Sequence, residues 1–272
     1  MESAVSTYIV PLHKKSNLYT NKITRLYRIS RLISHTFLGL FTVTLIFPLA
    51  GKYFKLRLIK WWCKHLLDIF NVGVTLFGNC PPSYKTASNN MMIANHISWL
   101  DIYAINSILP IRFVAKSDIR TWPVIGYLAS KANVLFIERG KKHQAARIMD
   151  IVALSLKAGD NLCLFPEGTT TDGTSIMPFK GSLIQSAIEA QSTIWPVAIR
   201  YPWHDGSANT DLAYAGETTL LQSMKQVLLQ KRPAAELHFL AQISMNEFEN
   251  EDNDRRALTL HIQSLIAKKL SL

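Results

Sequence analysis

From residue 72 onward, the chain alternates between two patterns of apolar residues. Short apolar runs bounded by turn residues predict buried strands, and apolar residues that recur every three or four positions predict amphipathic helices. The predicted strands are Val72–Phe77, Met91–Ala94, Arg112–Ala115, Asn133–Ile137, Asn161–Phe165, Thr193–Ile199 and Glu236–Ala241. The predicted helices lie near Leu100–Ser107, Lys142–Lys157, Ser182–Ala190, Thr218–Leu229 and Asp254–Lys269. Because strands and helices alternate, we expect residues 71–272 to form an α/β domain with a mostly parallel central sheet flanked by helices.

The first 70 residues follow a different pattern. The longest run without Asp, Glu, Lys or Arg extends from Leu32 to Gly51, and Pro48 interrupts it. The next segment, KYFKLRLIKWWCKHLLDIF, places apolar residues on one helical face and basic residues on another. We therefore expect residues 1–70 to form a basic, apolar helical hairpin that binds one leaflet of a membrane, with a true membrane span as the alternative.

The distribution of charge favours a membrane surface over nucleic acid as the partner. The formal net charge is +11, and residues 1–75 contain eleven Lys and Arg residues but only Glu2 and Asp68 among the acidic ones. Basic residues that flank an apolar run suit anionic lipid head groups. The three cysteines lack CxxC spacing, which predicts neither a disulfide framework nor a zinc site and suits a reducing compartment. No small-residue cleavage site follows the apolar run, so we expect no cleavable signal peptide.

Polar residues follow three of the predicted strands at the points where those strands end. Asn95 and His96 follow the second strand, and Arg139 follows the fourth. Glu167 and Gly168 follow the fifth. The carboxyl ends of parallel strands meet at one edge of a sheet, which is where α/β proteins bind ligands. We therefore expect these residues to converge on one site.

His96 and Asp101 could form the reactive part of that site. On one continuous helix their side chains would point about 140° apart. They can meet if His96 lies in the turn after the strand and Asp101 in the first helical turn. Asp101 would then accept a hydrogen bond from Nδ1 of His96, leaving Nε2 free as a base for a substrate hydroxyl. The alternative is that Asp101 only stabilises the helix start and His96 only fills a turn.

Three further stretches could bind the polar part of a substrate. Arg139, in LFIERGKK, suits a phosphate or carboxylate, or belongs to an ordinary basic surface. In LFPEGTTTDG, Thr169 and Thr170 offer hydroxyls beside Glu167, unless the segment is only a solvated turn. Lys180, in MPFKGS, lies at a predicted helix start that could hold an anion.

Two apolar positions are candidates for the wall of an acyl-chain site. Pro196 interrupts a strand pattern in IWPVAIRYP, which predicts a sheet edge or a bulge. Trp99 is expected to be a packed or membrane-facing aromatic residue rather than a reacting group.

In order along residues 70 to 245, these stretches resemble the glycerolipid and lysophospholipid acyltransferase family. NHISWLD resembles its first block, and the resemblance implies that His96 and Asp101 are the catalytic pair. FIER resembles the second block, which implies that Arg139 contacts the phosphate or glycerol region of the acceptor. FPEGT resembles the third, which implies that Glu167 and Gly168 bind acceptor hydroxyls, and WPVAI resembles the fourth, near the acyl-binding region.

The resemblance implies transfer of a fatty acyl group from acyl-carrier protein or coenzyme A to a lyso-lipid. It implies no bound cofactor and no metal, with acyl-carrier protein as a partner and the cytoplasmic face of the inner membrane as the location. Backbone amides near the His–Asp pair are expected to stabilise the oxyanion. The alternatives are a lipid-surface binding protein without activity and a hydrolase of acyl esters or thioesters.

One departure from the family pattern concerns the acceptor. Members that act on lysophosphatidate often carry Arg directly after EGT, whereas this chain has Thr170 there, and Glu138 replaces a common Asp. Losing a guanidinium weakens the case for a dianionic phosphate. A 1-acyl-glycerol-3-phosphate acyltransferase of phospholipid biosynthesis is the activity expected first. A lyso-ornithine lipid or other lysophospholipid acyltransferase is the alternative.

Overall fold

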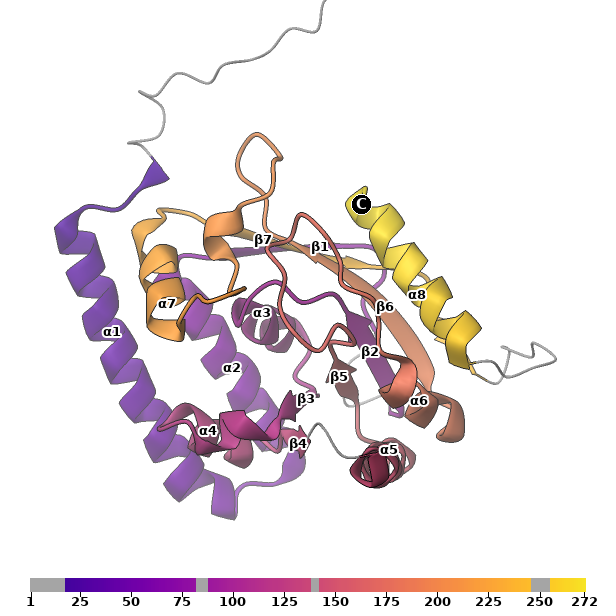
Figure 1. Cartoon of the computed structure of the whole chain (residues 1–272). Helices are drawn as coiled ribbons and strands as arrows, with labels where there is room; N and C mark the ends of the chain where they lie inside the picture. The colour runs from indigo at the N-terminus through magenta and orange to yellow at the C-terminus, as the bar shows by residue number, and fades with distance from the viewer. Residues whose placement is uncertain (1–17, 82–87, 138–141, 246–254) are drawn as a thin grey trace, which may run out of the picture.

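The structure is a computed structural model that describes residues 18–81, 88–137, 142–245 and 255–272. An eight-stranded sheet forms its centre (Figure 1). The strands are β1 (Gly73–Phe77), β2 (Asn90–Ala94), β3 (Arg112–Lys116), β4 (Leu135–Ile137), β5 (Leu162–Leu164), β6 (Thr193–Arg200), β7 (Ala234–Phe239) and β8 (Ile243–Ser244). Their order is β1-β7-β6-β2-β5-β3-β4, with β8 paired to β6.

The sheet is mostly parallel, as the alternating pattern predicted. Only β6 pairs antiparallel with its neighbours β7 and β8, and the other paired strands are parallel. Because β2, β3, β4, β5 and β6 all run in the same direction, their carboxyl ends lie along one edge. That edge is where the polar residues were expected to converge.

Helices cover both faces of the sheet (Figure 1). One face packs on α2 (Lys52–Phe70), α3 (Leu100–Ile108) and α7 (Leu220–Leu229), and the other on α5 (Lys142–Lys157), α6 (Gln185–Glu189) and α8 (Arg255–Leu270). The alternation of side chains along β2 explains how one strand supplies both cores. Met92 and Ala94 face the first layer of helices, and Met91 and Ile93 face the second.

The elements depart from the sequence expectation in a few places. The short strand β8 and the short helix α4 (Ile125–Lys131) were not predicted. The helix expected at Ser182–Ala190 is instead a 3₁₀ turn over Gly181–Leu183 followed by α6. Such short elements carry too few residues for a periodic pattern, so tertiary packing determines them.

The expectation that Pro196 marks a sheet edge is wrong, because β6 is an interior strand. On one side Pro196 pairs with Ile93 of β2. On the other side, β8 pairs with β6 up to Ile194 and β7 pairs with it from Val197 onward. Pro196 lies where one partner strand replaces the other, so its missing N–H disrupts no ladder. Its carbonyl still accepts a hydrogen bond from the N–H of Leu240 at 3.0 Å.

The N-terminal part of the described chain is a helical hairpin. Helix α1 (Lys22–Phe41) continues as a π-helix over Thr42–Ile46 and a 3₁₀ turn over Phe47–Leu49, and α2 returns alongside it. The two helices approach closely at Gly39, where a Cβ would lie 2.8 Å from Nε1 of Trp62. The same Trp62 ring stacks on the imidazole of His35, with centroids 4.6 Å apart. The carboxyl half of α2 also packs into the core of the α/β domain.

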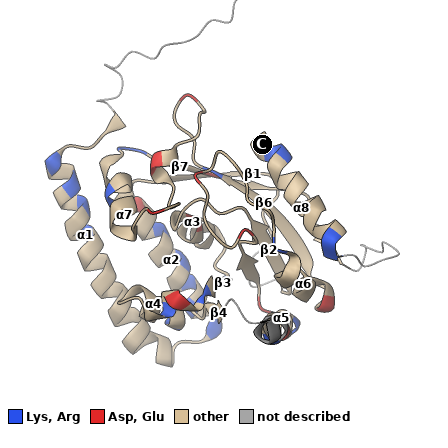
Figure 2. Cartoon of the chain, viewed as in Figure 1, with Lys and Arg blue, Asp and Glu red and all other residues tan. Residues whose placement is uncertain are grey.

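A large part of the hairpin surface is apolar and exposed. In the described residues, Lys22–Leu49 is the one helical stretch that is long and apolar enough to cross a membrane, judged by length and composition. Its exposed large apolar side chains are Ile23, Leu26, Tyr27, Ile29, Ile33, Phe37, Leu38, Phe41, Leu45 and Leu49. Figure 2 shows Lys and Arg residues toward the N-terminal end of α1 and along α2. The hairpin therefore combines an apolar surface with positive charge.

Candidate active site

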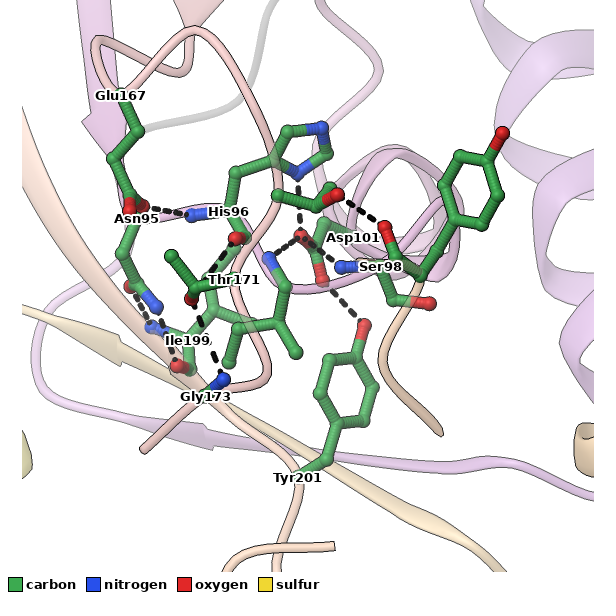
Figure 3. A network of polar contacts seen from close by, with 12 residues as sticks. Asn95, His96, Ser98, Asp101, Glu167, Thr171, Gly173, Ile199 and Tyr201 are labelled. Carbon is green, nitrogen blue, oxygen red and sulfur yellow. Dashed lines mark hydrogen bonds and ion pairs between the residues drawn. The ribbon is translucent and has the colours of Figure 1, made fainter. Parts of the chain in front are cut away.

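The candidate site begins with a clamp between β2 and β6. Asn95, directly after β2, is buried, and its side-chain amide donates to the carbonyl of Ile199 at 2.9 Å. Its side-chain oxygen accepts from the N–H of the same residue at 2.7 Å (Figure 3). These two bonds continue the pairing of β6 beyond the last backbone pair with β2. They therefore fix the turn that carries His96 relative to the end of β6.

His96 and Asp101 meet as the spacing allowed. His96 lies in the turn after β2, and Asp101 lies in the first turn of α3. Nδ1 of His96 is 2.7 Å from Oδ2 of Asp101, whose side chain is 0% exposed. The same oxygen accepts the backbone N–H groups of Ile97 at 2.8 Å and Ser98 at 3.0 Å. Because an ionised carboxylate only accepts, Nδ1 carries the proton and Nε2 presents a lone pair.

The imidazole is also held by an aromatic ring. Phe165, at the end of β5, stacks on His96 with centroids 3.9 Å apart and planes 6° from parallel. The ring of Phe113, from β3, lies 5.9 Å from that of Phe165. The side chain of His96 is therefore restrained on one edge by a carboxylate and on one face by a ring.

Glu167 connects two loops of the site through backbone donors. It is 2% exposed, and its Oε1 accepts the N–H of His96 at 2.7 Å. Its Oε2 accepts the N–H of Met177 at 2.8 Å. Burial raises the pKa of this carboxyl, and the two amide hydrogen bonds oppose that effect. Glu167 thus holds the backbone of the turn that carries His96 against the segment after β5.

The segment after β5 closes over the turn. Gly168 adopts a φ of 75°, which favours glycine. The hydroxyl of Thr170 donates to the carbonyl of Tyr214, and the N–H of Tyr214 donates to the carbonyl of Ile97 at 2.9 Å. The N–H of Thr171 donates to the carbonyl of His96, also at 2.9 Å. Backbone and side-chain hydrogen bonds therefore fix the turn from several directions.

These contacts bear on the expectation that backbone amides near the His–Asp pair stabilise an oxyanion. The amide N–H groups of His96, Ile97 and Ser98 all donate to carboxylates. These three N–H groups are therefore not free to bind an oxyanion. The hydroxyl of Ser98 is buried and has no hydrogen-bond partner among the described residues.

Comparison with known proteins shows the family of the chain. Residues 81–200 match the family model described as Acyltransferase. The chain is 34% identical over 201 residues to the lyso-ornithine lipid O-acyltransferase of Pseudomonas aeruginosa, covering 74% of this chain and 75% of the relative. It is 32% identical over 185 residues to the 1-acyl-sn-glycerol-3-phosphate acyltransferase of Neisseria gonorrhoeae, covering 68% and 71%. The chain belongs to the acyltransferase family. It is therefore an acyltransferase.

The fold of this acyltransferase also matches a solved structure. The crystal structure of the 1-acyl-sn-glycerophosphate acyltransferase PlsC from Thermotoga maritima superposes with a TM-score of 0.67. The match covers 92% of this chain and 95% of that one at 20% sequence identity, so it concerns the fold.

Three other candidate residues of the acyltransferase, Thr169, Lys180 and Trp99, differ in exposure. Thr169 and Lys180 are exposed, and the N–H of Lys180 donates to the carbonyl of Pro166 at 2.9 Å. Trp99 packs edge-on against Phe70, with centroids 5.5 Å apart, and against Tyr103. Its indole N–H donates to Ser223 at 3.0 Å, so Trp99 is a packed residue.

Two further expectations concern Pro196 and the FIER segment. Pro196 is buried within β6 and pairs with Ile93, three positions before His96. Arg139 and Glu138 lie outside the described residues. Within the described ranges, no cluster of three His, Cys, Asp or Glu residues could hold a metal ion.

Sequence reasoning missed several residues of the site. Tyr201 contacts Asp101, and Phe165 contacts His96. Thr171 contacts the backbone of His96. Tyr201 directly follows β6, so the same rule about strand ends could have found it. The stacking of Phe165 had no comparable signal, because an aromatic residue at a strand end is usually part of the core.

Proposed function

We propose that this acyltransferase moves a fatty acyl group from an acyl thioester to the free hydroxyl of a lyso-lipid, with His96 as the general base. The observation that carries the proposal is the 2.7 Å hydrogen bond between Nδ1 of His96 and Asp101, which leaves Nε2 as the acceptor for a substrate proton. A base oriented in this way suits activation of a hydroxyl that comes from the substrate. The names of the two relatives support a lyso-lipid as that substrate.

The reaction follows from the geometry in three steps. Nε2 of His96 takes the hydroxyl proton as the acceptor oxygen attacks the thioester carbonyl. Asp101 stabilises the imidazolium that forms and keeps the ring in its orientation. When the tetrahedral intermediate collapses, the C–S bond breaks and His96 returns the proton to the leaving thiolate. The products are the diacyl lipid and the free thiol of the carrier.

The donor is acyl-carrier protein or coenzyme A. Both are acidic, and the net charge of +11 favours association with either. Acyl-carrier protein is therefore a proposed partner, and neither donor requires a bound cofactor or metal for the chemistry above.

The residue at position 170 bears on whether the acceptor carries a phosphate monoester. Its hydroxyl donates to the carbonyl of Tyr214, so it holds the loop together. A Thr at this position supplies no charge to a phosphate. The relatives act on lyso-ornithine lipid in one case and on 1-acyl-sn-glycerol-3-phosphate in the other, according to their names. Arg139, Gly168, Thr169 and Lys180 remain proposed acceptor contacts, whereas Glu167 is proposed to act through the backbone of His96. Pro196 remains a proposed part of the acyl site.

The hairpin, within the proposed anchor of residues 1–70, would hold the enzyme at the lipid surface. Its exposed apolar residues and its basic residues match an anionic bilayer. The same surface extends to Val124, directly before α4, and to Tyr127 on α4, which are both exposed. Oη of Tyr127 lies 3.1 Å from Oγ1 of Thr44 in the hairpin. The 121–130 segment around them contains no Asp, Glu, Lys or Arg and is flanked by Arg120 and Lys131. We place this surface on the cytoplasmic face of the inner membrane, where the thioester donors are found.

A transfer assay on purified protein in liposomes tests the proposal. Acyl-carrier protein and coenzyme A thioesters are each offered with lysophosphatidate and with lyso-ornithine lipid. Replacing His96 with Ala should reduce diacyl product by a factor on the order of 10² to 10⁴. The control His261→Ala changes an exposed residue on α8 and should retain activity.

Three outcomes contradict the proposal. Full activity of His96→Ala would show that His96 is not the general base. Transfer by no donor–acceptor pair despite tight liposome binding would support a lipid-binding protein without activity. Release of the acyl group into water without a lyso-lipid would support a hydrolase.

A further inference from the structure

The carboxyl end of β6 places a phenol against the catalytic carboxylate. Tyr201 directly follows β6 and is 3% exposed. Its Oη lies 2.5 Å from Oδ1 of Asp101 (Figure 3). The clamp of Asn95 on Ile199 fixes this end of β6 relative to the turn that carries His96. The position of the phenol is therefore set by the sheet and not by a flexible loop.

The two oxygens of Asp101 have different partners. Oδ2 accepts from His96, Ile97 and Ser98, whereas Oδ1 accepts from Tyr201. Burial raises the pKa of Tyr201, and the negative charge of Asp101 raises it further, so the phenol remains protonated and donates. A fully buried carboxylate is costly unless donors satisfy it. Tyr201 supplies the donor on the side that faces away from the imidazole.

We propose that Tyr201 is a positioning residue of the acyltransferase, which fixes the plane of the Asp101 carboxylate and moderates the basicity of His96. The inference rests on the proposed role of His96 as the base. A strong donor on Oδ1 withdraws charge from the carboxylate and so weakens its pull on the proton at Nδ1. Removing that donor should therefore strengthen the hold of Asp101 on the imidazole.

Other titratable groups also face the dyad and contribute to its pH dependence. Glu167, from the β5 loop, interacts with the charges of both His96 and Asp101. The buried thiol of Cys163, from β5, has a pKa raised well above its usual value by burial and by Asp101, so it stays neutral. Because these groups are unchanged in Tyr201 variants, a difference between variants reports on the phenol.

The test compares pH–rate profiles of variants at Tyr201. Tyr201→Phe keeps the ring and removes the donor, so Asp101 pulls more strongly on His96 and can rotate. We expect kcat to fall about tenfold, equivalent to one hydrogen bond to a charged group, with KM unchanged for both substrates. The acidic limb of the kcat profile should move to higher pH by about half a unit or more.

A second variant shifts the profile in the opposite direction. Site-specific 3-fluorotyrosine at position 201 keeps the shape of the side chain and donates more strongly, so the acidic limb should move to lower pH. The control Tyr103→Phe removes a phenol that packs on Trp62 and Trp99, and its profile should be that of the wild type.

Unchanged kcat and unchanged limbs in both Tyr201 variants would overturn the proposal, even if Tyr201→Phe unfolded at a lower temperature. If Tyr201→Phe fails to fold, the 3-fluorotyrosine variant alone decides. The outcome is separate from that of the proposed function. If His96→Ala is inactive but the Tyr201 profiles do not move, only the role of Tyr201 fails.

Discussion

Replacing Glu167 with Gln separates two roles for this residue. The resemblance to the family implies that Glu167 binds acceptor hydroxyls. The structure shows that its two oxygens accept the N–H groups of His96 at 2.7 Å and Met177 at 2.8 Å. In Glu167→Gln the amide oxygen can satisfy one of these donors, but the amide NH₂ group then faces the other N–H.

The size of the effect follows from these contacts. A hydrogen bond to a charged group contributes about 1.5–3 kcal/mol, and a buried unpaired donor adds a cost of about 1–3 kcal/mol. Burial raises the pKa of Glu167, so the cost of burying its charge offsets part of the stabilisation that these hydrogen bonds provide. We therefore expect the free energy of unfolding to fall by about 2–4 kcal/mol. We also expect kcat to fall because the turn carrying His96 shifts.

Urea unfolding and steady-state kinetics with varied acceptor concentration measure both quantities. KM for the acceptor should change little if Glu167 acts through the backbone of His96. The control Glu217→Gln changes an exposed carboxylate and should leave kcat, KM and stability unchanged. A large rise in KM with unchanged kcat and stability would refute this reasoning and favour direct acceptor binding.

Three other variants test separate parts of the structure. Thr170→Arg adds a cation where the family resemblance implies an Arg in members that act on lysophosphatidate, so the ratio of kcat/KM for lysophosphatidate over lyso-ornithine lipid should rise. An unchanged ratio would show that this position does not set acceptor specificity. Val124→Asp places a charge at the exposed apolar position directly before α4 and should weaken sedimentation with anionic vesicles without lowering transfer in detergent. Equal sedimentation would show that Val124 does not contact the membrane. Burial lowers the pKa of His238 from its usual value of 6.5. The unfolded chain therefore binds a proton at His238 more tightly than the folded protein does, and the free energy of unfolding decreases as pH falls through about 6.5. His238→Gln should therefore flatten the fall in unfolding free energy between about pH 7.5 and 5.5, measured by urea unfolding at each pH, and an unchanged slope would contradict this assignment.

The sequence predicted the sheet and the core of the site because both depend on regular patterns. Strand–helix alternation gave the parallel strands, and the strand-end rule gave His96 and Glu167. The spacing of His96 and Asp101 allowed contact only if a turn came before the helix, and the structure has that turn.

The partners of these residues depend on tertiary contacts that no local pattern records. The carboxylate of Glu167 was read as a ligand for substrate, but it accepts two backbone N–H groups. Tyr201 is 100 residues from Asp101 along the chain, so the contact follows only from the pairing of β6 with β2. Pro196 was expected at an edge or a bulge. The replacement of β8 by β7 as the partner of β6 could not be predicted from the strand sequence itself.

The most direct test of the account is the single-turnover transfer rate of Asp101→Asn in liposomes. The amide keeps the size of the side chain, but it can donate to Nδ1 of His96 and so favour the tautomer in which Nε2 carries the proton. We predict a rate lower by a factor on the order of 10³, with liposome binding retained. A rate close to that of the wild type would show that the hydrogen bond between Asp101 and His96 does not prepare the base.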